Sequence, residues 1–111
     1  MEDERVPCVY ILASGLYGTL YIGVTSDLIG RLWQHRNAAL PGFTSRYKVH
    51  RLVHYEFQGT MEHAILREKQ LKRWHRQWKI NLINEGNPHW EDLAVRLGLP
   101  PMAPCLGRNG P

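Results

Sequence analysis

Two short apolar segments joined by a glycine-rich loop constrain the fold of this 111-residue chain more than any other feature. Residues 7–13 (PCVYILA) and 19–24 (TLYIGV) are rich in the β-branched and aromatic side chains that favour strands. The intervening residues 14–18 (SGLYG) contain the serine and glycine that tight turns prefer. The pattern therefore predicts a β-hairpin at the start of the domain.

The register of this hairpin decides which side chains share a face of the sheet. If residues 14–19 form the loop, Tyr10 lies opposite Gly23, and both share a face with Tyr21. Gly23 then leaves space opposite Tyr10 that a ligand or a backbone can approach. A shift of one residue would separate the two tyrosines, and they would then be core residues with hydroxyl groups at the rim.

Apolar spacing and capping residues predict the remaining elements. A strand is expected at residues 51–57, with Leu52, His54 and Glu56 alternating onto one face. Helices are expected over residues 25–38, 61–78, 78–86 and 87–98, with Thr25 or Ser26, Thr60, and Asn87 before Pro88 as N-terminal caps. The order β-β-α-β-α-α-α is that of an α+β fold, a small three-stranded antiparallel sheet flanked by helices.

The composition, 43% apolar and 22% charged, fits a single soluble globular domain. We assign the domain to residues 7–98, with a flexible N-terminus at 1–6 and a disordered Pro/Gly-rich tail at 99–111. No apolar run approaches the ~20 residues that span a bilayer, and the acidic N-terminus does not resemble a secretory signal. A cytoplasmic location is expected, with Cys8 as a small buried hydrophobic residue rather than a disulfide partner.

The charge is concentrated in the middle of the chain. Residues 31–79 contain eleven Lys and Arg against three Glu, although the net charge of the whole chain is only +4. This surplus favours a polyanionic partner such as nucleic acid. A solvated basic helix face would give the same composition.

One carboxylate falls where packing alone would not place it. On the helix predicted over residues 61–78, Glu68 lies between Ile65 and Leu71 on the apolar stripe. A carboxylate that faces a core is costly unless it is paired or binds a metal. Glu68 is therefore either a site carboxylate or the partner of a buried arginine, whereas Glu62 lies in the first turn, where an acid is expected anyway.

Two polar residues share a face of the first predicted helix. Arg31 and His35 are four residues apart, beside the buried stripe that includes Leu28. Alone they could be surface residues. Combined with Tyr10, Tyr21 and Glu68 they supply what phosphodiester hydrolysis needs. A carboxylate can hold Mg²⁺, an arginine can neutralise the phosphate, and a tyrosine or histidine can move protons.

The same residues resemble the signature of the GIY-YIG nucleases. CVY (residues 8–10) and YIG (21–23) resemble the two signature triads, and RLWQH (31–35) is similar to the Arg-x-x-x-His helix of that family. Glu68, in AILREKQLKRW, resembles the metal-binding glutamate. The resemblance extends over about residues 7 to 97 and is greatest to short standalone bacterial members, which carry similar REKQLKRW and NPxWxDL stretches.

The resemblance implies hydrolysis of DNA phosphodiester bonds with Mg²⁺, for which Mn²⁺ can substitute. It implies that Glu68 is the protein ligand of the metal and that Tyr10 takes the proton of the attacking water. It assigns Arg31 to the scissile phosphate, Tyr21 to the phosphate or to the orientation of Tyr10, and His35 to the same network. Gly23 would give clearance for the backbone.

Two positions depart from the family pattern or are ambiguous in it. Cys8 replaces the glycine of the first triad. Asn87 is either the late active-site asparagine of the family or only a helix cap. Contacts with DNA are expected from Lys69, Lys72, Arg73 and Arg76. Thr44, Arg46 and Tyr47 lie in a loop that is either a DNA contact or solvated.

The sequence thus favours a metal-dependent DNA endonuclease, with repair or recombination as its process by analogy with the family. The alternatives are a non-catalytic nucleic-acid-binding module on the same fold and a protein in which the five polar residues form only a buried network. The sequence does not determine the oligomeric state.

Overall fold

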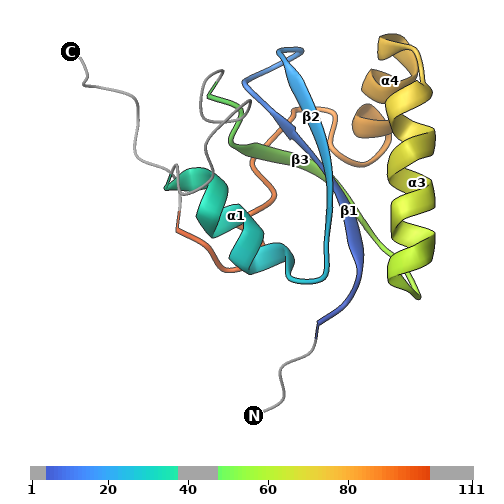
Figure 1. Cartoon of the computed structure of the whole chain (residues 1–111). Coiled ribbons are helices and arrows are strands. Elements are labelled where there is room, and N and C mark those ends of the chain that lie inside the picture. The colour runs from blue at the N-terminus through green and yellow to red at the C-terminus, as the bar shows by residue number, and fades with distance from the viewer. Residues whose placement is uncertain (1–4, 38–47, 101–111) are drawn as a thin grey trace.

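A computed structural model describes residues 5–37 and 48–100 of the chain (Figure 1). The α+β architecture and the three-stranded antiparallel sheet are as predicted. In chain order the elements are β1 (Cys8–Ala13), β2 (Leu20–Thr25), α1 (Leu28–Arg36), β3 (Arg51–Phe57), α3 (Met61–Arg73) and α4 (Arg76–Gly86).

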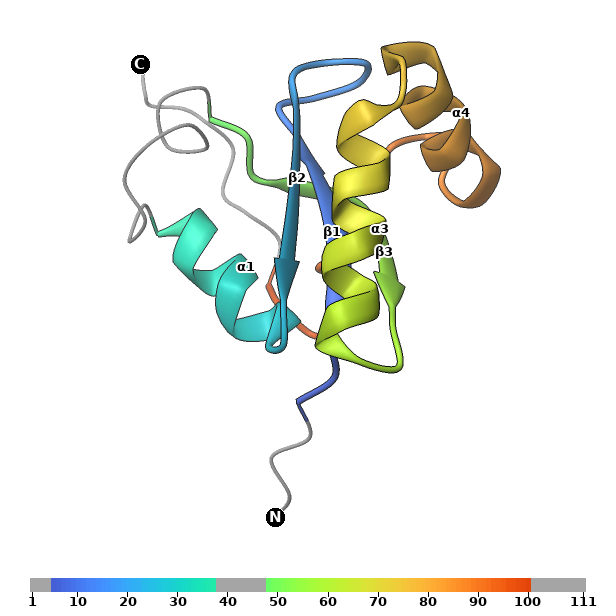
Figure 2. The same ribbon diagram turned by 45° about the vertical axis from the view of Figure 1, so that its right-hand side comes forward.

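The sheet has the strand order β2-β1-β3 and separates two hydrophobic clusters. The predicted hairpin register is confirmed, because Tyr10 pairs with Gly23 and Ala13 with Leu20. Val9 and Ile11 face the cluster beneath α3 and α4, whereas Tyr10 and the other even-numbered residues of β1 face the cluster beneath α1. Figures 1 and 2 show α1 on one side of the sheet and α3 on the other.

A β-bulge in β3 overturns the expected alternation of that strand. Leu52 pairs with Leu12 while His54 pairs with Ile11, so that Val53 is the additional residue. Leu52 therefore lies on the α1 face, and His54 and Glu56 lie on the α3 face. The prediction that these three share a face was wrong because an extra residue in one strand inverts the side chains that follow it.

The helix boundaries also differ from those expected. Asp27, rather than Thr25 or Ser26, caps α1 by accepting a hydrogen bond from the Gly30 amide at 3.1 Å. The long helix ends at Arg73, because the next two residues, Trp74 and His75, have extended backbones. The break lies four residues before the expected end at 78, where no glycine or proline marks it.

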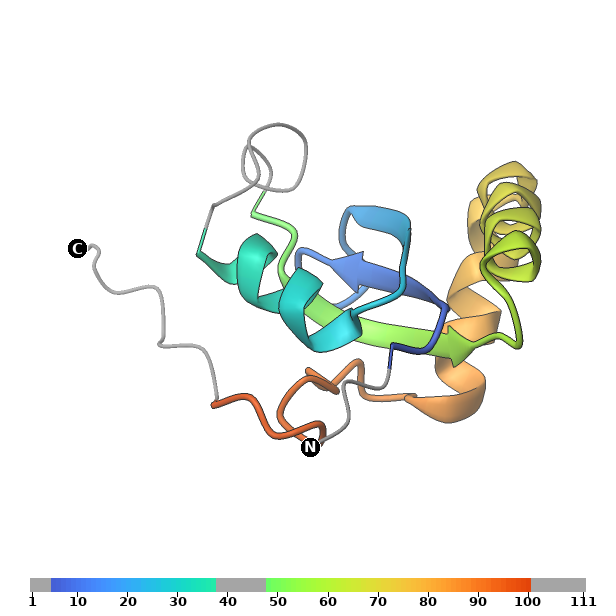
Figure 3. The same ribbon diagram turned by 60° about the horizontal axis from the view of Figure 1, so that its bottom comes forward.

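The segment 87–98, expected to be a helix, is a series of turns (Figure 3). Its hydrogen bonds join residues three apart, and Trp90 adopts a left-handed φ of 54°. The segment crosses the outer edge of β3, where Leu93 donates a backbone hydrogen bond to Leu52 and the Asp92 carboxylate accepts one from the Leu52 amide. Trp90 consequently lies in one hydrophobic cluster and Ala94 in the other, which a straight helix could not achieve.

The N-terminal turn of this segment depends on the Asn87 side chain. Its amide nitrogen donates to the carbonyl oxygens of Val53 and Glu91, and its carbonyl oxygen accepts from the Glu91 amide. Asn87 is therefore not the cap of a following α-helix. It is a buried residue that ties the crossing segment to β3.

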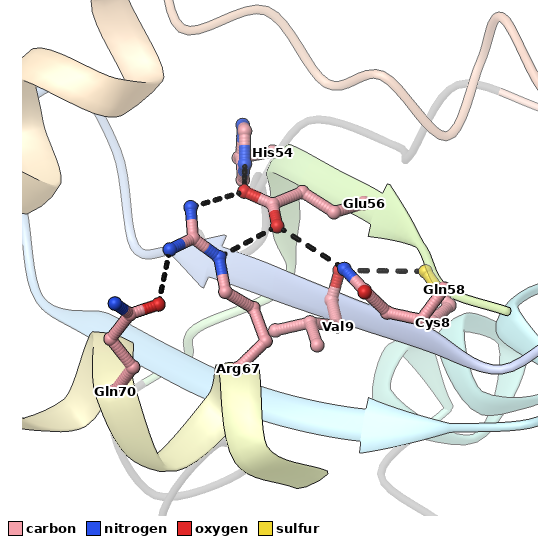
Figure 4. Close-up of polar contacts among 7 residues, drawn as sticks. All are labelled: Cys8, Val9, His54, Glu56, Gln58, Arg67 and Gln70. Atoms are coloured by element: carbon pink, nitrogen blue, oxygen red, sulfur yellow. Dashed lines mark hydrogen bonds and ion pairs between the residues drawn. The ribbon is translucent and has the colours of Figure 1, made fainter. Parts of the chain in front are cut away.

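A polar network joins α3 to β3 (Figure 4). The Arg67 guanidinium donates to both carboxylate oxygens of Glu56 at 2.8 and 3.0 Å, and His54 contacts the same carboxylate at 2.8 Å. The hydrogen bond with His54, followed by those from Arg67, lowers the Glu56 pKa to about 2 despite partial burial. The arginine–carboxylate pair that we considered for Glu68 is thus formed by Arg67 with Glu56.

We predict that Arg67→Ala lowers the free energy of unfolding by about 1–3 kcal/mol, since it leaves the partly buried Glu56 carboxylate without its bidentate partner. Lys72→Ala removes an ion pair from the same helix whose lysine is 54% exposed, and should cost less than about 0.5 kcal/mol. Urea titration of both variants at pH 7 provides the comparison. Equal losses would contradict a structural role for the Glu56–Arg67 pair.

Candidate active site

The site begins with a close contact between β1 and β2. A Cβ atom on Gly23 would lie 2.5 Å from both Cζ and Oη of Tyr10, so that any other residue would collide with the phenol ring. The space over Gly23, which we expected to admit a ligand or backbone, is filled by the Tyr10 side chain. This arrangement lets a tyrosine of the central strand extend over the edge strand.

Three aromatic rings meet above this contact. The Tyr10 hydroxyl lies 3.1 Å from Nε2 of His35, which is 2% exposed in the last turn of α1. The ring of Tyr21 lies beside both, with centroids 6.3 Å from Tyr10 and 5.6 Å from His35. The helix and the hairpin therefore bring together three of the predicted site residues.

Burial, modified by the charge of Arg31, determines the protonation of this cluster. Burial and the neighbouring Tyr21 raise the pKa of Tyr10 above its ordinary value, while the charge and hydrogen bond of Arg31 oppose this rise. Burial and then the Arg31 charge lower the pKa of His35 to about 4. At neutral pH Tyr10 is therefore a phenol and His35 a neutral ring. If the proton of His35 is on Nδ1, Nε2 can accept the hydrogen bond of the phenol.

The two tyrosines differ in their access to solvent. Tyr10 is completely buried, whereas Tyr21 is partly exposed and lines a surface groove of about 370 Å³. The groove is formed by Leu20, Tyr21, Ile22, Lys72 and Lys79. It connects the hairpin with the basic surface of α3 and α4. Lys79 was not among the expected DNA contacts, although it is the last cation of the basic middle segment.

Glu68 lies on the other side of the sheet from α1. Its side chain is 16% exposed and pairs with Lys72 at 3.2 Å, as expected for a residue that borders the core. The predicted apolar stripe was only partly right, because Leu71 is buried whereas Ile65 is 36% exposed. The helices α1 and α3 lie on opposite sides of the sheet, and β2 is one of its two edge strands (Figure 2).

The remaining expected site residues occupy different surroundings. Lys69 and Arg73 are exposed on α3, whereas the amide of Asn87 is engaged in the hydrogen bonds to Val53 and Glu91. Tyr47, with Thr44 and Arg46, lies outside the described residues. In residues 5–37 and 48–100, no three His, Cys, Asp or Glu side chains are grouped as a metal cage. The helices in these ranges are too short or too polar to cross a membrane.

Residues 6–81 match the GIY-YIG catalytic domain, and the chain belongs to this family of nuclease-like proteins.

Relatives of similar size share much of this domain. The UPF0213 protein SSP2268 of Staphylococcus saprophyticus is 35% identical over 69 residues, which cover 62% of this chain and 84% of the relative. The UPF0213 protein SERP0126 of Staphylococcus epidermidis is 33% identical over the same shares of each chain. A UPF0213 protein of Staphylococcus aureus strain Mu3 is 32% identical, with 61% of this chain and 83% of the relative covered. No solved structure matches the chain.

The buried neutral His35 predicts a pH dependence of stability. Its folded pKa of about 4 lies below its ordinary 6.5, so that protonation favours the unfolded chain. The neutral His35 ring contributes its full share to the free energy of unfolding above pH 6.5. This contribution is lost as the pH falls from 6.5 towards 4. At pH 5 we expect a loss of about 2 kcal/mol relative to pH 8, measured by urea unfolding.

Two histidine variants test whether His35 causes this loss of stability at low pH. His35→Gln should remove that component of the pH dependence, whereas His63→Gln, on the exposed start of α3, should retain it. Identical pH profiles for wild type and His35→Gln would show that the ring of His35 is not held neutral.

Proposed function

We propose that this protein is an endonuclease that hydrolyses DNA phosphodiester bonds with Mg²⁺, for which Mn²⁺ can substitute. The observation that supports this most strongly is the hydrogen bond between the buried Tyr10 hydroxyl and Nε2 of His35, next to Arg31. Membership of the GIY-YIG family supports the nuclease class. The metal, the DNA substrate and the residue roles are our proposal.

The protonation states suggest how a tyrosine could act as a base. A phenol with a raised pKa is a poor base alone, because its own proton must leave first. His35 is neutral, and its Nε2 lies 3.1 Å from the Tyr10 oxygen. We propose that Tyr10 takes a proton from the attacking water as its own hydroxyl proton passes to His35.

The burial of Tyr10 requires that DNA uncovers its hydroxyl. Arg31 lies close enough to this hydroxyl to lower the pKa of Tyr10. A phosphate is a stronger partner for a guanidinium than a neutral phenol is, because the bond is assisted by opposite charges. We propose that Arg31 moves onto the scissile phosphate, which admits water to Tyr10, and that Tyr21 hydrogen-bonds the same phosphate from the groove.

The donor set on α3 suits a magnesium ion held jointly with the substrate. Mg²⁺ keeps several waters and binds through one or two carboxylates plus substrate phosphates rather than through a cage of side chains. Glu68 offers one such carboxylate, and its partner Lys72 is exposed enough to move towards a phosphate. A bound ion would supply charge neutralisation at the phosphate.

The basic groove between the hairpin and α4 fits the DNA backbone. Lys72 and Lys79 line it together with Tyr21, while Lys69 and Arg73 are exposed on α3. Such contacts position a duplex without reading its sequence. We therefore expect weak, salt-sensitive binding with little sequence preference.

The test is a plasmid-nicking assay with Mg²⁺. Glu68→Gln removes the carboxylate charge while preserving size, and we expect nicking to fall by roughly 10²-fold or more, because the ion loses its protein ligand. Glu62→Gln on the exposed first turn of the same helix is the matched control and should cut at the wild-type rate. Equal rates for Glu68→Gln and wild type would rule out the proposed metal role.

The proposed proton transfer, from water to Tyr10 and from Tyr10 to His35, predicts how the nicking rates of two further variants compare. Tyr10→Phe and His35→Gln should each reduce the rate by about 10²- to 10⁴-fold, the range expected for loss of a general base. Their double mutant should be little slower than either single mutant, since both residues act on one proton. DNA binding without nicking by the wild-type protein would favour the non-catalytic binding module instead.

A further inference from the structure

The junction of α3 and α4 carries a pair of tryptophans that the proposed chemistry does not use. Trp74 is partly buried against the cluster beneath α3, whereas Trp78 is 53% exposed. Their ring centroids are 5.9 Å apart and the ring planes meet at 83°. The guanidinium of Arg67 lies 5.2 Å from the centroid of Trp74 and helps to fix that ring. The two rings thus form a right-angled aromatic corner.

This corner forms the wall of a cleft of about 300 Å³. The lining residues are Trp74, Trp78, Asn81, Leu82 and Glu85. Asn81 and Glu85 follow Trp78 by three and seven positions and therefore lie on the same face of α4. A nucleobase could stack on one ring with its edge against the other. Its polar edge would then face the Asn81 amide and the Glu85 carboxylate, which are side chains that hydrogen-bond bases.

The cleft and the basic groove of the proposed active site are lined by consecutive residues of α4. Lys79 lines the groove together with Tyr21 and directly follows Trp78, which lines the cleft, so that the two side chains leave the helix about 100° apart. Lys72 lines the groove two residues before Trp74. A strand whose phosphates lie along these lysines would pass from Tyr21 to the tryptophan corner. The cations attract the backbone, whereas the cleft itself offers an acid and aromatic faces that suit a base and not a phosphate.

We propose that the Trp74–Trp78 cleft binds an unpaired base of the substrate whose backbone occupies the groove. The preferred substrate is then a duplex with a single-stranded extension rather than a blunt duplex. A base inside a duplex has both faces stacked and cannot enter the corner. This inference rests on the proposed function for the position of the DNA, and it adds the substrate class.

The test measures binding without cleavage. Fluorescein-labelled duplexes, either blunt or extended by unpaired nucleotides on the 5′ or the 3′ strand, are titrated in EDTA and followed by anisotropy. The wild-type protein should bind one of the extended duplexes at least about fivefold more tightly than the blunt one, the gain expected from one stacked base. Trp78→Ala should lose this advantage and bind both duplexes with equal Kd.

Trp33→Ala is the matched control. Trp33 is 58% exposed on α1, on the other side of the sheet, and its removal should leave the advantage intact. Quenching of tryptophan fluorescence by the extended duplex should persist in Trp33→Ala and diminish in Trp78→Ala. Trp78→Phe, which retains a smaller ring, should recover part of the advantage. Trp78→Leu repeats the test if circular dichroism shows that the alanine variant is unfolded.

Two results would overturn the proposal. One is an equal Kd of the wild-type protein for blunt and extended duplexes, which would assign the tryptophan surface to another kind of partner. The other is an unchanged advantage in Trp78→Ala. The outcome is independent of catalysis, because EDTA removes the metal. If plasmid nicking fails while the Trp78 effect holds, the proposed nuclease function is wrong but the base-binding cleft remains.

Discussion

The contact of the Tyr10 ring with the bare backbone of Gly23 is the constraint on which the site depends. The ring can extend over β2 only because position 23 has no side chain. Its hydroxyl therefore meets His35 at the end of α1, and Arg31 lies one turn earlier on the same face. Leu28 and Leu32 lie on the same buried side of α1 as His35 and pack in the cluster that includes Tyr10. Packing and the proposed chemistry thus use the same tyrosine.

In the described part of the chain, another segment covers one edge strand of the sheet, β3, but not the other, β2. The candidate site lies at the uncovered edge. The segment that follows α4 covers the outer edge of β3 through Asp92, Leu93 and the amide of Asn87. In the described part of the chain, β2 has backbone partners only on β1. Its outer edge lies between α1 and α3, where Tyr21 and the lysines form the groove. The uncovered edge, that of β2, is therefore the one towards which Tyr10, Tyr21 and His35 are directed.

Two neighbouring charged residues of α3 point in different directions. Arg67 has a structural role, whereas Glu68 is the residue with a proposed catalytic role. Arg67 points to β3 and neutralises Glu56, which shows why the helix carries an inward-facing charge that is not catalytic. Glu68, the next residue, is turned about 100° from Arg67 and pairs with the exposed side chain of Lys72. A partly buried carboxylate whose partner is an exposed lysine can exchange that partner for a metal ion at less cost than one clamped by a bidentate arginine.

The sequence alone predicted the hairpin and singled out Tyr10, Tyr21, Arg31 and His35, and it predicted the register on the assumption that residues 14–19 form the loop, which the structure confirms. Loop length fixes strand register, and helical periodicity places Arg31 and His35 on one face; both are local properties of neighbouring residues. Tertiary structure decided the bulge at Val53, the break after Arg73, and the non-helical path of 87–98. It also decided that Tyr10 is buried while Tyr21 is only partly buried. These features arise because segments that are far apart in the sequence pack against the same small sheet. Local sequence patterns do not report such long-range packing.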